Sequence, residues 1–304
     1  MYRSDADRSA ATPWPAPRGP AVGWHGKGAA RAYFDGSRWV RDDPPSLTTA
    51  LAVVAVLAVS LLVARPFIEL GEAAGVPVPI LAVSLIVLGY LPPVAVAVAL
   101  LRRDTAGIGW LSTVGGRFRG VDLAWGVLVW FIAIVVQAVV FGLVDGFGVP
   151  VSDNTGALGD DSIGADLVVI TAVAAVLVAP LVEEFVFRGV VQRALIARIG
   201  TVPGVAAQGM LFGVAHIDPV AGVGNIGLAL VLSGVGIIFG AAVVRFGRLG
   251  PAIVAHAVFN AVVVALVVWV PQSTSSSGSA ELGSIWCRSR GYRSVACRQP
   301  RRRR

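Results

Sequence analysis

Three hydrophobic segments in the second half of the chain carry chemically active side chains at helical spacing. Glu184 and Arg188 lie four residues apart in LVEEFVFRG, and His256 and Asn260 do so in HAVFN. In LFGVAHI, between them, His216 follows a phenylalanine by four residues. Residues four apart share one helix face, and an ionisable side chain in lipid is costly unless it faces a protein interior or a wet cavity. The three polar faces are therefore predicted to meet in one site.

Glu183 adds a second carboxylate to this site. It precedes Glu184 and points about 100° away from it on a helix, so it is free for a different partner. A carboxylate and an imidazole that share one water can remove its proton, and a His or Asn N–H can hold the oxyanion that forms when a carbonyl is attacked. These are the parts that peptide hydrolysis in a membrane pocket needs.

A metal site is the competing arrangement of the same side chains. His216, His256 and Glu183 would make a His2Glu ligand set, which suits zinc with one open position for water. The sequence contains no His-Glu-x-x-His motif, the usual zinc signature on a single helix. A zinc cofactor and a metal-free mechanism both remain open.

Each of these residues also has a structural interpretation. Glu184 and Arg188 would form an ordinary ion pair at the cytoplasmic membrane interface. His216 and the His256–Asn260 pair would be hydrogen-bonded contacts between helices. The aromatic ring of Phe212 would pack against its neighbours whatever the function.

The composition requires a lipid environment for the elements that carry these residues. The chain has 304 residues, of which 56% are hydrophobic and 14% are charged, and its mean hydropathy is +0.76. A span needs about 20 apolar residues. We predict an all-α membrane protein, a polytopic bundle of about seven transmembrane helices with a polar cavity, over residues 47–70, 76–101, 122–146, 165–187, 203–217, 223–244 and 250–270.

The distribution of basic residues predicts the orientation of the bundle. The net charge is +7, but the basic residues before the tail gather ahead of the first span and in the stretches 102–121, 188–202 and 245–249, while 147–164 is acidic. Residues 271–304 carry eight more arginines, although seven spans would place this tail outside; either the tail is too far from the membrane to count, or the number of spans differs by one. The positive-inside rule then places the N-terminus of a multi-pass cell-membrane protein in the cytoplasm, and we expect the site to open to that side. The charge does not indicate a nucleic-acid partner; the expected partners are the lipid bilayer and a peptide or membrane-protein substrate.

Four regions are predicted along the chain. Residues 1–46 form a cytoplasmic leader, in which Asp35–Gly36 between aromatic runs favours a tight hairpin. Residues 47–164 form accessory transmembrane helices, and 165–270 form the catalytic core. Residues 271–304 form an Arg-rich, disordered tail, which contains the two cysteines, Cys287 and Cys297.

The ordered motifs resemble a known family. Glu-Glu-x-x-x-Arg at 183–188, Phe-x-x-x-His at 212–216 and His-x-x-x-Asn at 256–260 look like the CPBP family of CAAX prenyl proteases and bacteriocin-processing enzymes. The resemblance implies that Glu183 and His216 activate water, that Glu184 and Arg188 orient the site, and that His256 and Asn260 stabilise the oxyanion. Members are described both as metalloproteases and as metal-free glutamate proteases.

The resemblance leaves two other functions open. A catalytically silent scaffold or bacteriocin-immunity protein could share the fold, and a proton-coupled transporter could use the same Glu and His side chains as a relay. Prenylated CAAX substrates do not suit a bacterial host, which the Trp-bearing leader indicates, so the peptide substrate is left unidentified.

The depth of the site residues raises a geometric conflict. From Pro203, at the cytoplasmic edge, His216 lies about 20 Å along its helix, whereas His256 is only about 9 Å into its own. Glu183 is expected close to the cytoplasmic side. The three meet only if the helix of His216 begins below the membrane plane or is strongly tilted. We interpret residues 188–198 as an interfacial connector that allows this.

Overall fold

The computed structural model describes residues 23–25, 32–34, 39–41, 44–104, 109–152, 164–217 and 224–269. The leader before Gly23, the tail from residue 270 with Cys287 and Cys297, and the Asp35–Gly36 pair lie outside the described residues.

A small antiparallel sheet precedes the helices. It has the strand order β1 (Gly23–His25), β2 (Ala32–Phe34) and β3 (Trp39–Arg41). Strands β2 and β3 flank the predicted turn, and Phe34 lies opposite Trp39, so positions 35–38 connect them.

Six helices of the described chain are long and apolar enough to cross a membrane. They are α1 (Leu47–Ala73), α2 (Val78–Asp104), α4 (Asp122–Gly146), α9 (Gly224–Phe246), α10 (Gly250–Trp269) and one continuous helix over Ala165–Ile199. The continuous helix consists of α5 (Ala165–Val173), η3 (Ala174–Val178), α6 (Ala179–Glu183), η4 (Glu184–Val191) and α7 (Gln192–Ile199). A single turn of helix, α3 (Trp110–Thr113), lies between α2 and α4. The prediction of an all-α membrane bundle is confirmed.

The fifth predicted span differs from the others in length. It forms α8 (Thr201–Val214), which is about 21 Å long and so shorter than the roughly 30 Å hydrocarbon core. Helix α8 packs along α9 and ends inside the bundle.

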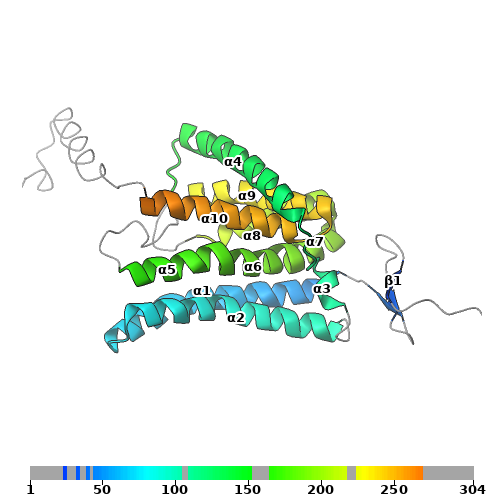
Figure 1. Cartoon of the computed structure of the whole chain (residues 1–304), viewed down its shortest axis with the longest axis horizontal. Coiled ribbons are helices and arrows are strands. Elements are labelled where there is room, and N and C mark those ends of the chain that lie inside the picture. Colours follow the sequence, from blue (N-terminus) through cyan, green and yellow to red (C-terminus); the bar gives the residue numbers. More distant parts are fainter. Residues whose placement is uncertain are drawn as a thin grey trace, which may run out of the picture.

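The long helix over 165–199 lies in the middle of the bundle (Figure 1). Helices α1 and α2 pack together on one side of it, α10 packs on the other, and α4 covers α9 and α10 from outside. Large apolar side chains on α1, α2 and α4 are exposed, among them Leu62, Leu91 and Phe131. Such a surface suits lipid contact.

One end of the bundle contains the helix ends Leu47, Asp104, Asp122, Ile199, Phe246 and Gly250. We call it the basic end, because Arg102, Arg103, Arg198 and Arg245 lie in the last turns of helices that end there. We call the opposite end the far end. At the basic end, Arg248 joins the α9–α10 connection to the start of α4, because its Nε donates to Asp122 at 2.8 Å. Hydrogen bonding to this carboxylate raises the pKa of Arg248. Thr49 likewise donates to Asp104 at 3.1 Å, joining α1 to α2.

The predicted interfacial connector is wrong, and the correction removes the conflict of depth. Residues 188–198 continue the long helix, and Arg188 is fully buried. Arg193 reaches the carbonyl of Gly247 at 3.5 Å, so the helix runs about 9 Å past that level to Ile199. The helix α8 therefore begins below the start of α10, as its depth requires. Glu183 lies about 24 Å from Ile199, which matches His216 at about 23 Å from the start of α8.

Candidate active site

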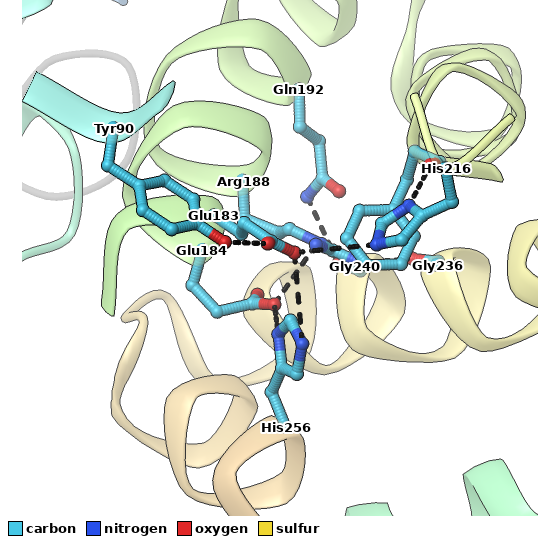
Figure 2. A network of polar contacts seen from close by, with 10 residues as sticks. Tyr90, Glu183, Glu184, Arg188, Gln192, His216, Gly236, Gly240 and His256 are labelled. Carbon is cyan, nitrogen blue, oxygen red and sulfur yellow. Dashed lines mark hydrogen bonds and ion pairs between the residues drawn. The ribbon is translucent and has the colours of Figure 1, made fainter. Parts of the chain in front are cut away.

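Glu183 lies at the centre of the polar cluster, at the C-terminal end of α6. Its Oε1 accepts a hydrogen bond from the Tyr90 hydroxyl at 3.0 Å. Its Oε2 lies 3.8 Å from Nε2 of His216 and 3.8 Å from Nε2 of His256. Among the described residues, this buried Oε2 has no hydrogen-bond partner. One carboxylate oxygen is thus fixed, and the other faces both histidines without a direct hydrogen bond (Figure 2).

The second ring nitrogen of each histidine determines what its Nε2 can do. Nδ1 of His216 lies 2.8 Å from the carbonyl oxygen of Phe212. A carbonyl only accepts, so Nδ1 is the donor and Nε2 of the neutral ring is an acceptor. Nδ1 of His256 lies 2.9 Å from Oε1 of Glu184, and this carboxylate also favours a proton on Nδ1. Both Nε2 atoms therefore face Glu183 from rings held in a defined orientation.

Glu184 and Arg188 support His256 from inside the bundle. Nη1 of Arg188 donates to Glu184 Oε1 at 3.0 Å, and Nη2 donates to the carbonyl of Gly236 at 3.3 Å. Both side chains are 0% exposed. The guanidinium also lies 4.3 Å from the ring centroid of Phe212, at cation–π distance. The sequence-based alternative of an interfacial ion pair is wrong, because the pair is enclosed by protein.

Phe212 is the common neighbour of the site residues. It is 2% exposed, and its ring centroid lies 4.6 Å from that of His216 and 5.9 Å from that of His256. Gly209 and Gly213, one turn apart on α8, let this helix approach α9 closely; a Cβ at Gly209 would lie 2.9 Å from the backbone nitrogen of Ile237. The close approach brings Phe212 and His216 against α9.

Two π-helical stretches flank Glu183 on its own helix, η3 before it and η4 after it. In η3 the N–H of Ala179 bonds to the carbonyl of Ala174. The next donor in this register would be residue 180, a proline without an N–H, so the carbonyl of Ala175 has no donor there. Nδ2 of Asn260 donates to it at 2.7 Å. The predicted site residue Asn260 therefore holds α10 to η3.

Three polar side chains near the site were not predicted. Tyr90, on α2, binds Glu183 from a helix outside the motif segments. Gln192 donates to the carbonyl of Gly240 at 3.0 Å, and Gln208 is fully buried with no partner for its amide in the described part of the chain. Gln192 follows Arg188 by four residues and Gln208 precedes Phe212 by four, so the spacing of the motifs could have revealed both.

A cavity of about 330 Å³ contains the site. Its polar lining comes from Tyr90, Thr171, Glu183, His216, His256 and Asn260. The rest of the wall is apolar, and includes Ile86, Ala174, Ala175, Ala179, Leu232, Val235, Val263 and Val264. The side chains of Glu183 and His216 are 15% and 23% exposed, so both can be reached by a molecule in the cavity.

The three potential metal ligands do not have the spacing of a zinc site. Zinc bonds of about 2.0–2.1 Å at tetrahedral angles would place ligand atoms roughly 3.4 Å apart, whereas Glu183 Oε2 lies 3.8 Å from each Nε2. Across the described chain, no group of three His, Cys, Asp or Glu side chains could hold a metal ion. The donor types suit zinc, but their arrangement does not fit it.

Comparison with known proteins identifies the segment that carries the site. Residues 165–262 match the family model described as type II CAAX prenyl endopeptidase Rce1-like. No curated protein and no solved structure matches the chain. The matched segment contains Glu183, Glu184, His216, His256 and Asn260 but excludes Tyr90. Residues 165–262 therefore form a domain of the Rce1-like type II CAAX prenyl endopeptidase family.

Proposed function

We propose that this protein is an intramembrane endopeptidase that hydrolyses a peptide bond with water activated by Glu183 and His216. The observation that carries the proposal is the unpartnered Oε2 of Glu183, 3.8 Å from both Nε2 atoms. The mechanism requires a water at this gap, hydrogen-bonded to Oε2 of Glu183 and to Nε2 of His216 at about 2.8 Å from each. It would be held next to a base and within reach of a carbonyl in the cavity.

The two histidines have different roles in this mechanism. His216 Nε2 accepts one proton of the water in a hydrogen bond, because its Nδ1 donates to Phe212. Glu184 holds the ring of His256 through Nδ1, and we assign Nε2 of this ring to the oxyanion, to which it donates when both ring nitrogens carry a proton. Arg188 keeps Glu184 in place for this task. Asn260 lines the cavity and has a second N–H for the same oxyanion.

The reaction then proceeds through one tetrahedral intermediate. Glu183 takes a proton from the water while the water oxygen bonds to the carbonyl carbon. The carbonyl oxygen becomes the oxyanion that His256 stabilises. The C–N bond breaks when the intermediate collapses. Glu183 gives its proton to the leaving amine, which restores the carboxylate.

The test uses the full-length protein, purified in detergent and incubated with a peptide pool whose products are identified by mass spectrometry. We expect cleavage by the unmodified protein and its loss in Glu183→Ala, His216→Ala and His256→Ala. Glu72→Gln is the matched control, because Glu72 is exposed at the far end of α1, outside the site. Cleavage that persists in folded Glu183→Ala protein would contradict the mechanism, and a scaffold or transporter would then be the better description.

A further inference from the structure

The cavity has a direction with respect to the two ends of the bundle. From Glu183 it continues along the long helix to Thr171, about 18 Å toward the far end. On α10 it continues from His256 to Val264, about 12 Å in the same direction. On α2 the lining residue Ile86 also lies farther toward the far end than Tyr90. All three walls therefore extend the cavity away from the basic end.

Protein closes the other side of the site. Toward the basic end from Glu183, the side chains of Arg188, Gln192 and Gln208 are at most 1% exposed. The rings of Phe212 and Phe239 cover the Arg188 guanidinium at 4.3 and 5.5 Å. These three buried polar side chains therefore close the cavity on the side of the basic end.

The short helix α8 explains this asymmetry. It rises from the basic end and reaches His216 at the level of Glu183. Helix α9, beside it, continues toward the far end and lines the cavity with Leu232 and Val235. The cavity thus extends beyond the C-terminal end of α8, on the far-end side of the two catalytic histidines.

We propose that the substrate reaches the site from the extracytoplasmic face of the membrane, as an extended peptide segment with apolar side chains. This inference rests on the proposed function and on the cytoplasmic orientation predicted for the basic end. The wall between Glu183 and the far end is mainly aliphatic and small, with Phe259, Asn260 and Thr171 also in it, and a mainly apolar wall favours apolar substrate residues. The substrate is then an exported peptide or the outer part of a membrane protein. This proposal differs from the sequence-based expectation that the site opens to the cytoplasm.

The test labels single cysteines in intact cells and in inverted vesicles with a membrane-impermeant maleimide. Cys287 and Cys297 are first replaced by serine. Thr171→Cys places a thiol in the cavity wall, and Val169→Cys is its control at nearly the same depth, because Val169 is 60% exposed on the lipid-facing surface. Val264→Cys with Leu266→Cys repeats the comparison on α10, where Leu266 is 56% exposed.

We expect Thr171→Cys and Val264→Cys to be labelled from outside the cell, about tenfold faster than their lipid-facing controls, since maleimide needs a hydrated thiolate. Glu72→Cys and Arg117→Cys, exposed at the far and basic ends, report which face is outside. Labelling of the cavity cysteines only in inverted vesicles would overturn the proposal, as would no labelling from either face. Labelling requires no cleavage, so this result is independent of the test of peptidase activity.

Discussion

Removing the charge of Arg188 tests whether the site depends on a buried ionic network. The guanidinium donates to Glu184 at 3.0 Å and to Gly236 at 3.3 Å, and both charged side chains are 0% exposed. Loss of one partner of a buried ion pair costs about 3–5 kcal/mol, because the other charge is left unpaired. Nδ1 of His256 still binds the same oxygen of Glu184. We therefore expect the lower part of this range, about 3 kcal/mol, for Arg188→Met.

The assay is reversible unfolding of the full chain in mixed micelles, followed by tryptophan fluorescence. A loss of about 3 kcal/mol shifts the unfolding equilibrium by roughly a hundredfold. The double variant Glu184→Gln/Arg188→Met should recover most of the loss, because no unpaired charge remains. Arg117→Met, at an exposed position, should stay within about 0.5 kcal/mol of the unmodified protein. If Arg188→Met matches that control, or the double variant is less stable than the single one, the buried network is refuted.

Three further predictions concern the site directly. Tyr90→Phe should lower kcat by about ten- to a hundredfold with little change in KM, because it removes the hydrogen bond that fixes Oε1 of Glu183; an unchanged kcat would show that Tyr90 only packs there. Asn260→Ala should destabilise the protein by about 1–3 kcal/mol, since the carbonyl of Ala175 loses its donor; equal unfolding midpoints for this variant and the unmodified protein would contradict it. Treatment with a chelator followed by dialysis should leave peptide cleavage unchanged, because the 3.8 Å spacings do not fit zinc; activity lost with chelator and restored by zinc would overturn that conclusion.

The helical segments and the convergence of the motifs could be predicted because both follow from the free-energy cost of leaving polar groups unpaired in lipid. A chain this apolar must satisfy its backbone inside helices, and polar side chains four residues apart share a face that cannot remain in lipid. Glu183, His216 and His256 do line one cavity, and Glu184 binds His256. The catalytic roles assigned to them stay predictions.

The depth of the site could not be predicted because it depends on where helices begin relative to one another. Arginines near a predicted membrane edge indicate an interface, yet Arg188 is buried by Glu184, Phe212 and Phe239. The sequence-based interpretation of 188–198 as an interfacial connector therefore ended the long helix too early. Only contacts distant in sequence, such as that of Arg193 with Gly247, show that α8 begins below α10.

Tyr90 was missed for a different reason. It is an isolated hydroxyl in an apolar helix, 93 residues from the glutamate it binds, and nothing in its local sequence pairs with it. An unpaired polar group in a predicted membrane helix is nevertheless a signal, because it needs a partner somewhere in the bundle.

The most direct test of the mechanism is the rate of peptide cleavage by purified Glu183→Gln protein. This change keeps the shape of the side chain and its place near Tyr90, His216 and His256, but removes the base. The mechanism predicts a loss of about 10²–10⁴-fold in kcat, with an unfolding midpoint close to that of the unmodified protein and full activity in Glu72→Gln. Cleavage by folded Glu183→Gln protein within a few fold of the unmodified rate would contradict it.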